Sequence, residues 1–361
     1  MISICNAVPQ IIKLILIWGD LDLMTKILST TGIPVILALF KMINLWTAKE
    51  KLEPLIACIE QDWTNYKTEN ERQLMVHWAK KCRKVSLFYV FLSQSSIGFF
   101  TIHQLSLAII EGRNDLTNIT RITYLEGYFP YDINKSPNFQ LWWLLQCISL
   151  QLGNVTFVGI DSLFAILVLH ICGQFRVLRQ RVLECVEETD GEFHKRKLHE
   201  KVSLIIRRHA HLNNCITVIE DTFNLTFLVQ IIGYTTLFCV QGYVLILAMT
   251  EDHVGSSALE LAFMIIYIQY MVLNFYLCCY IGETFRKEST RISFAAYSCK
   301  WYNLRPKEAK FILFLVHRAR RTVDITAGKF FVFTLELFTT IMKTSLGYLS
   351  MLLAAKRGNM N

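Results

Sequence analysis

The sequence predicts an all-α fold, a bundle of seven transmembrane helices with a cytoplasmic amino terminus and an extracellular carboxyl terminus. Three observations predict it. Of the 361 residues, 53% are hydrophobic and 18% are charged, and the mean hydropathy is +0.36, which is far more apolar than an ordinary soluble domain. Apolar stretches of membrane-spanning length recur along the chain. The basic residues gather in alternate connections between these stretches.

Each stretch is judged by length, because a bilayer core of roughly 30 Å needs about 20 mostly apolar residues per helix. The first stretch is barely long enough and contains Lys13, so we expect the natural chain to begin upstream. It lacks a basic segment followed by a small-residue cleavage site, so we expect no removable signal peptide. The predicted spans cover residues 4–18, 28–46, 85–110, 139–175, 223–249, 257–282 and 330–354 of a single domain, 1–361.

The distribution of lysine and arginine predicts the orientation, because loops rich in these residues stay in the cytoplasm. The connections 47–84, 176–214 and 283–328 hold 27 of the 37 Lys and Arg residues, whereas the other connections and the carboxyl-terminal tail hold 6. The basic connections follow the second, fourth and sixth spans. This topology accounts for the net charge of +8, so we expect a lipid membrane and no nucleic acid as partner.

Asn118-Ile119-Thr120 is a glycosylation motif in a loop predicted to be extracellular, so Asn118 is a candidate glycosylation site. None of the 11 cysteines lies in a predicted outer loop, and we expect them to act as small buried hydrophobic residues. The sequence has no zinc-protease, phosphate-loop or nucleophile-elbow motif. It therefore predicts no enzyme, no cofactor and no metal site.

The last span contains charged residues at a regular spacing. Lys329, Glu336 and Lys343 are seven residues apart, which at 100° per residue places them on one helical face. Charged side chains within a membrane are costly and commonly mark a conduction path or a pair between helices. The spacing leaves both interpretations open, a polar stripe facing a water-filled pore or a buried ion pair.

The outer halves of the third and fourth spans bring aromatic and polar residues to a similar depth. Such a mixture is typical of small-molecule pockets, in which apolar walls give affinity and a few polar groups give orientation. Ordinary packing, or an interfacial aromatic belt, explains any single one of these residues better than a pocket does. The candidate ligand-binding residues are Phe99, Phe100, His103, Trp143, Gln146, Cys147 and Leu150, with Trp142 assigned to the belt.

The carboxyl-terminal part of the chain contains a set of distinctive stretches: Cys279 to Gly282, Lys287-Glu288-Ser289, Ala295 to Tyr302, Thr326-Ala327-Gly328-Lys329-Phe330-Phe331 and Leu335 to Ser345. Through these stretches the chain resembles the insect odorant receptor family over about the last eighty residues. Weaker similarity extends upstream to residues 18–24 and 169–174.

The resemblance implies a tetrameric, non-selective cation channel of olfactory sensory neurons, in the cell membrane. In it this subunit would bind a small volatile odorant and assemble with an olfactory co-receptor. The connection 176–214 is shorter than the co-receptor's, which favours an odorant-specific subunit. The family also implies an intersubunit anchor helix at about 306–320, a pocket to which Met264 is added, and a pore lined by the last span. The candidate pore and gate residues are Glu336, Lys343, Tyr348, Met351 and Ala355.

Two other receptor classes have seven spans. A G-protein-coupled receptor would have its basic loops on the opposite side, and its helix-3 acid-arginine and helix-7 asparagine-proline motifs are absent from the sequence. A gustatory receptor channel shares the expected topology. Its threonine-tyrosine to glutamine-phenylalanine ending is also absent.

Overall fold

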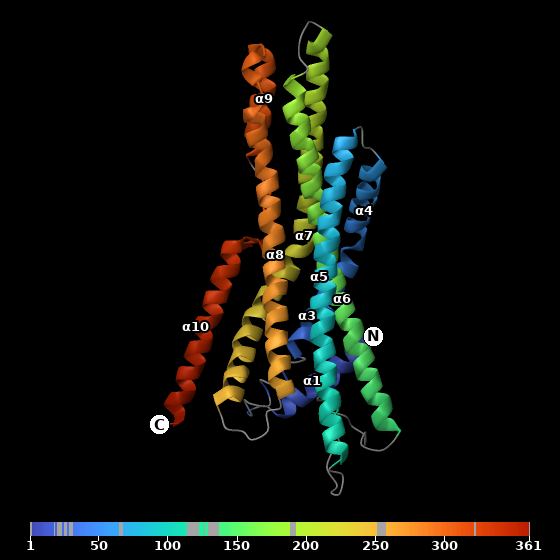
Figure 1. Ribbon diagram of the computed structural model, residues 1–361, viewed down its shortest axis with the longest axis vertical. Coiled ribbons are helices and arrows are strands. Elements are labelled where there is room, and N and C mark those ends of the chain that lie inside the picture. Colours follow the sequence, from blue (N-terminus) through green and yellow to red (C-terminus); the bar gives the residue numbers. More distant parts are fainter. Residues whose placement is uncertain are drawn as a thin grey trace.

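The computed structural model describes residues 2–17, 19, 24, 27–28, 32–64, 68–113, 123–125, 127–128, 137–187, 193–250, 258–320 and 323–360. Within these ranges the chain is mainly helical (Figure 1). The α-helices are α1 (Ile2–Leu16), α3 (Ile33–Thr47), α4 (Lys49–Thr64), α5 (Glu69–Arg113), α6 (Asn138–Glu187), α7 (Phe193–Thr250), α8 (Ala258–Ser298), α9 (Pro306–Ala319) and α10 (Leu335–Met360).

Helices α5 to α8 are longer than a membrane is thick. They contain 45, 50, 58 and 41 residues, so even α8 is about 60 Å long at 1.5 Å per residue. Among the described helices these four are long and apolar enough to cross a membrane, and α3 is a shorter apolar helix. The long helices therefore continue beyond the bilayer at the end that also holds α4 and α9, uppermost in Figure 1. We call this part the α4 end.

The seven predicted spans lie on α1, α3, α5, α6, α7, α8 and α10. Trp18, residues 29–31 and Ser257, at or near the edges of three predicted spans, lie outside the described residues. The predicted helix at about 306–320 corresponds to α9. Helix α9 begins at Pro306, where the missing amide proton costs nothing, and the Glu308 carboxylate accepts a hydrogen bond from the Arg305 amide.

Helix α6 forms the centre of the bundle and packs against α1, α3, α5, α7 and α8. Of its most apolar 18-residue window, 67% is buried, the largest share among the four long apolar helices. Phe164 on α6 contacts Phe223 and Phe227 on α7, with ring centroids 5.5 and 4.6 Å apart. Within a membrane, where lipid is as apolar as these rings, close packing of this kind stabilises the contact between helices.

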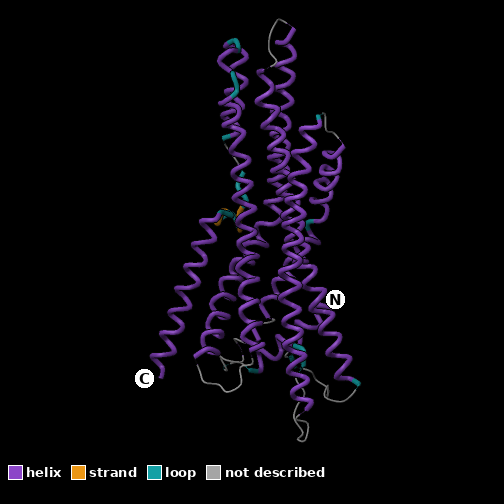
Figure 2. Tube along the Cα trace, viewed as in Figure 1, coloured by secondary structure: helices purple, strands orange, loops and turns teal. Residues whose placement is uncertain are grey.

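A short hairpin connects the α9 region to α10 (Figure 2). Strand β1 (Thr326–Ala327) pairs antiparallel with β2 (Phe331–Val332). The turn between them has positive φ at Gly328 (60°) and Lys329 (65°), as a type I′ turn requires. Phe330 N–H donates to the Ala327 carbonyl at 3.2 Å. The hairpin therefore reverses the chain just before α10.

This hairpin corrects the prediction that a helix covers residues 330–354. Helix α10 begins at Leu335, where the Thr334 hydroxyl accepts a hydrogen bond from Leu337 N–H and caps the first turn. The prediction that Lys329 shares a helical face with Glu336 and Lys343 is wrong, because Lys329 has a left-handed backbone that a helix excludes. Instead the Lys329 ammonium binds carboxylates on α7.

The hairpin is attached to α7 by polar contacts. Gly328 N–H donates to the Asn224 carbonyl at 2.9 Å. Lys329 Nζ contacts the Glu220 carboxylate and lies 2.7 Å from Asp221 Oδ1. A Cβ at position 328 would lie 2.5 Å from a methyl group of Leu228, so any other residue there would displace the Leu228 side chain and strain the backbone, which has a φ of 60°. These contacts explain the role of the Thr326 to Phe331 motif: it fixes the start of α10 against α7.

Candidate functional site

A cavity of about 120 Å³ lies between α3, α5, α6, α7 and α8. Its walls are mostly aromatic and aliphatic, with a few hydroxyl and amide groups among them. This is the composition of a site that takes an apolar ligand and orients it by a small number of hydrogen bonds. The lining residues include Leu37, Ile97, Phe100, Leu150, Phe157, Leu237, Phe263, Met271, Ser93, Ser96, Ser149, Asn154, Tyr234, Tyr267 and Tyr270.

One amide in the cavity lining has spare hydrogen-bonding capacity. Ser93 Oγ donates to Asn154 Oδ1 across the α5–α6 contact. Asn154 Nδ2 is buried and has no hydrogen-bond partner among the residues the structure describes. A buried donor without a partner is costly, so a ligand oxygen that reached Nδ2 after a small rotation of the Asn154 amide would recover that cost. Asn154 is therefore the polar residue best suited to orient a ligand.

A buried ion pair borders the cavity. Lys41 Nζ lies 2.5 Å from Asp161 Oδ1, and both side chains are 1% exposed. Asn274 donates to the other Asp161 oxygen at 3.4 Å and accepts a hydrogen bond of 2.8 Å from the Tyr234 hydroxyl. Lys41 also lies 3.5 Å from the ring centroid of Phe157. The pair is neutral overall, so the cavity wall presents no unpaired charge to a ligand.

The loop segment Thr123 to Leu125, here called the cap, covers the aromatic cluster of α5 and α6. Tyr124 is fully buried and packs edge-on against Phe100 and Trp143, with ring centroids 5.4 and 5.0 Å apart. Its hydroxyl lies 2.9 Å from Thr101 Oγ1. The Gln146 amide accepts from Leu125 N–H at 3.3 Å and donates to the Leu125 carbonyl at 3.2 Å. Phe100, Trp143 and Gln146, which were predicted to bind a ligand, thus keep the cap in place.

The eight candidate ligand-binding residues fall into separate groups. Phe100 and Leu150 line the cavity, whereas Trp143 and Gln146 contact the cap. His103 is buried, and its ring stacks on Phe263 at 6.0 Å. The remaining three do not line the cavity: Phe99 is 38% exposed, and Cys147 and Met264 are partly buried against the core.

The cavity lies deeper than the aromatic cluster that the sequence singled out. Ser93 and Asn154 were not candidates, although both are polar side chains within apolar spans. Such residues are costly to bury without a role. Their position inward of Phe100 and Leu150 could therefore have indicated the cavity from the sequence. Tyr234 and Tyr270 carried no comparable signal, because aromatic residues in a span are ordinary packing residues.

The candidate pore residues lie on α10. Glu336, Lys343, Tyr348 and Met351 are exposed, and neither Glu336 nor Lys343 forms an ion pair within the described part of the chain. The side chain of Ala355 lies outside the described residues, as does the candidate glycosylation site Asn118. The described residues therefore offer neither Glu336 nor Lys343 a partner for the buried ion pair that the spacing had left open.

Comparison with known proteins identifies the class. The family model described as 7tm Odorant receptor matches residues 23–346, so the chain belongs to the odorant receptor family. This family consists of receptors and not of enzymes, as the sequence predicted.

Among individual proteins, the chain is similar to Odorant receptor 85c of Drosophila melanogaster, with 23% identity over 90% of this chain and 81% of that protein. It is also similar to Odorant receptor 13a of the same species, with 24% identity over 62% of this chain and 55% of that protein. An odorant receptor coreceptor of Ooceraea biroi is 26% identical over 42% of this chain and 30% of its own length. The matched region thus spans about half of Odorant receptor 13a and less of the coreceptor.

The fold is that of a solved insect receptor. The olfactory receptor OR5 of Machilis hrabei superimposes with a TM-score of 0.82, 15% sequence identity, and coverage of 98% of this chain and 86% of that one. A structure of the same receptor in complex with eugenol matches equally well. The predicted all-α seven-transmembrane bundle is therefore confirmed.

Proposed function

We propose that this chain is an odorant-specific subunit that binds a small volatile molecule in the cavity and opens a non-selective cation channel formed with the olfactory co-receptor. The single observation that carries the proposal is the mostly apolar cavity among α3 and α5 to α8, whose lining includes Asn154, an amide with an unpartnered Nδ2 among the described residues. Membership in the odorant receptor family supplies the ligand class. The similarity to odorant receptor coreceptors supports the choice of partner.

The cavity favours a compact ligand. An apolar protein cavity of about 150 Å³ holds benzene, and the cavity here is about 120 Å³. Because the lining that the structure describes contains no charged side chain and the adjacent Lys41 and Asp161 are paired with each other, the ligand is neutral. A molecule with a single aromatic or short aliphatic body and one oxygen acceptor would fill the space and accept a hydrogen bond from Asn154.

Packing links the cavity to the helix proposed to line the pore. Tyr234 lines the cavity, and its ring centroid is 6.3 Å from that of Phe275 on α8. Phe275 in turn packs against Phe338 on α10 at 5.7 Å. A ligand that binds the open arrangement more tightly than the closed one would shift the population toward opening. This series of contacts is a route along which a displaced Tyr234 would move α10.

The exposed faces of α9 and α10 support an oligomer, proposed to be a tetramer. On α9, Phe311, Leu313 and Phe314 are 39%, 67% and 51% exposed, a patch that a neighbouring subunit would cover. On α10 the exposed Glu336, Lys343, Tyr348 and Met351, together with Ala355, would face the pore. Four copies of α10 around an axis would surround a water-filled path for cations.

The proposed site of action is the plasma membrane of olfactory sensory neurons. The basic connections would hold the amino terminus and the α4 end in the cytoplasm. The cavity would then lie toward the extracellular half of the membrane, where a volatile ligand arrives, and Asn118 would be available for glycosylation.

The test is whole-cell current in cells that express this chain with or without an olfactory co-receptor, challenged with neutral volatiles while G-protein signalling is blocked. We expect a rapid cation current that requires the co-receptor and persists under the blockade. A response abolished by the blockade would overturn the channel proposal in favour of a G-protein-coupled receptor. A current of equal size without the co-receptor would overturn the proposed hetero-oligomer.

A further inference from the structure

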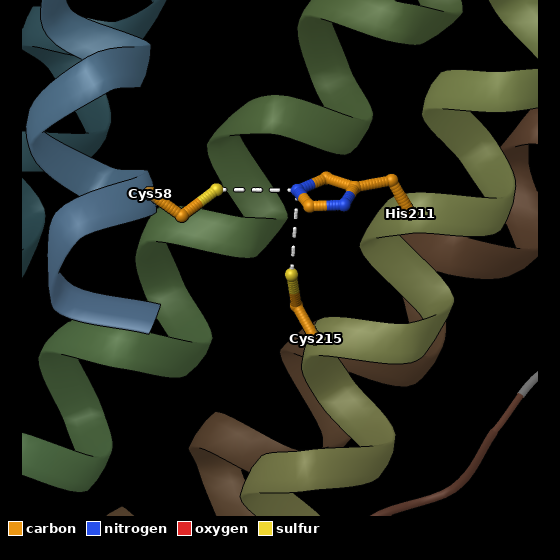
Figure 3. A group of neighbouring side chains, drawn as sticks. All are labelled: Cys58, His211 and Cys215. Atoms are coloured by element: carbon orange, nitrogen blue, oxygen red, sulfur yellow. Dashed lines mark hydrogen bonds between the residues drawn. The ribbon is translucent and has the colours of Figure 1, made fainter. Parts of the chain in front are cut away.

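Three side chains that bind soft metal ions meet at the α4 end of the molecule, outside the cavity. Cys58 extends from α4, and His211 and Cys215 extend from α7 toward it (Figure 3). Cys58 Sγ lies 3.2 Å from His211 Nε2, and Cys215 Sγ lies 3.6 Å from the same nitrogen. All three atoms lie within 4.8 Å of one another. Two thiols and an imidazole thus surround one point.

The two sulfur to nitrogen distances match the edges of a tetrahedral zinc site. Zinc binds sulfur at about 2.3 Å and imidazole nitrogen at about 2.0 to 2.1 Å with tetrahedral angles, which puts a ligand sulfur and a ligand nitrogen about 3.6 Å apart. The two observed sulfur to nitrogen distances, 3.2 and 3.6 Å, lie close to this value. The two sulfur atoms lie within 4.8 Å of each other, and a tetrahedral site would bring them to about 3.8 Å.

The two helices are held in the register that the cluster needs. His211 and Cys215 are four residues apart on α7 and so share one face of the helix. One turn after Cys58, Asp62 accepts a hydrogen bond from Arg208, which lies one turn before His211. This ion pair joins α4 to α7 beside the cluster. The three ligands are therefore placed in advance, and little ordering is required to bind an ion.

The surroundings admit an ion and favour a soft one. His211 is exposed and Cys58 is half-buried, beside a cavity of about 410 Å³ that all three ligands line. An ion can thus enter, and a water molecule can occupy a fourth position. Thiolate and imidazole ligands select zinc over magnesium and calcium, which take oxygen ligands. The charge of nearby Arg208 is balanced by Asp62, so it repels the ion little.

We propose that Cys58, His211 and Cys215 form a zinc site that joins α4 to α7. The sequence predicted no metal site because Cys58 and His211 are 153 residues apart, and no motif spacing connects them. Further along α7, Asp221 lines the same adjacent cavity and binds Lys329 before α10. Zinc would therefore stiffen the segment of α7 to which the start of α10 is attached.

The test uses the full-length protein in lipid nanodiscs, loaded with Zn²⁺ or with Co²⁺ under reducing conditions and then freed of unbound ion. We expect one zinc ion per chain by elemental analysis, and a thiolate-to-cobalt charge-transfer band with Co²⁺. Cys58→Ser, Cys215→Ser and His211→Gln should each weaken binding by more than about a hundredfold, because even indirect supporting residues contribute 10–100-fold. Cys299→Ser and His317→Gln are the matched controls and should bind as the unmodified protein does.

Three results would overturn the zinc site. The first is the absence of bound ion in the unmodified protein after loading. The second is binding that survives in all three ligand variants, which would locate the ion elsewhere. The third is a Cys58 to Cys215 disulfide in the protein isolated without reductant, together with no uptake of metal by the reduced form, which would make the cluster a redox pair. Thermal unfolding in the presence of a chelator checks that the variants fold like the unmodified chain.

Discussion

The region around the cavity and the α4 end of the molecule are held together by different forces. Around the cavity the helices meet mainly through apolar and aromatic side chains, and the Lys41–Asp161 pair is the ion pair that the described residues place beside it. At the α4 end, ion pairs between charged side chains instead join separate helices. Asp62 accepts hydrogen bonds from His170, at 3.1 Å, and from Arg208.

The same pattern is repeated further along the α4 end. Arg181 on α6 binds both carboxylate oxygens of Glu71 on α5, at 2.6 and 2.9 Å. Bidentate contacts of this kind are directional and fix the relative position of helices, whereas apolar contacts are non-directional. We infer that the α4 end acts as a fixed frame and that the cavity walls adapt to the ligand. The predictions below test this contrast, from the largest expected effect to the smallest.

Loss of one member of the buried pair should have the largest effect on stability. Asp161→Ala leaves the Lys41 ammonium buried without its partner, which costs about 3–5 kcal/mol in comparable cases. We expect a marked decrease in thermal stability in detergent and little protein at the cell surface. The double variant Lys41→Met with Asp161→Leu removes both charges and should recover most of the loss. Equal stability of Asp161→Ala and the unmodified chain would show that the pair is not needed.

Loss of the cap should come next. Tyr124→Ala removes a fully buried ring between Phe100 and Trp143 and should cost about 3 kcal/mol, at the low end for a buried aromatic residue. It should also shift ligand preference toward larger molecules, measured as the ratio of responses to a homologous series of volatiles. Tyr124→Phe is the control, since it loses only the hydrogen bond to Thr101 and should keep the preference. An unchanged ligand preference in Tyr124→Ala would contradict the inference that the cavity walls adapt to the ligand.

A smaller effect is expected from the charged frame. Asp62→Asn keeps the shape but removes the charge that binds Arg208 and His170. Hydrogen bonds to charged groups contribute about 1.5–3 kcal/mol, so thermal stability should fall by that order while ligand sensitivity stays unchanged. The measurement is thermal unfolding together with a dose–response curve. A large shift in ligand sensitivity would contradict the assignment of the α4 end to a fixed frame.

The same carboxylate predicts a pH effect. Burial raises the pKa of Asp62, but hydrogen bonds from His170 and Arg208 and the Arg208 charge outweigh it, so the pKa lies below its ordinary value of 3.8. Because the folded-state pKa is lowered, the stabilisation is complete above 3.8 and is lost as the pH falls through the folded-state value. The stability difference between the unmodified chain and Asp62→Asn should therefore shrink below that pH. A constant difference would contradict the prediction.

The sequence predicted where the apolar helices lie, but neither their extensions into the α4 end nor their contacts, for a physical reason. Hydropathy depends only on local composition, so each apolar span was visible without knowledge of its neighbours. Residues 330–334 are equally apolar, and nothing in that composition reveals that Gly328 and Lys329 take positive φ and turn the chain. The helix was therefore predicted to start too early, and Lys329 was placed on the wrong element.

The site was only partly predictable because its parts come from distant segments. Phe100 and Leu150 were chosen for composition and do line the cavity. Lys41 and Asp161 are 120 residues apart, and no spacing rule pairs residues of different spans. The cap could not be foreseen either, because a loop residue such as Tyr124 becomes fully buried only through tertiary packing.

The most direct test of the central claim, that the ligand acts in the cavity, compares two glycine substitutions on α6. A Cβ at either Gly153 or Gly159 meets no atom within 4 Å, but only Gly153 lines the cavity. Gly153→Leu should lower the ligand sensitivity of the co-receptor-dependent current at least about tenfold, which corresponds to about 1.4 kcal/mol of binding free energy. Gly159→Leu should leave that sensitivity unchanged. Equal sensitivity of the two variants at equal surface expression would contradict the account.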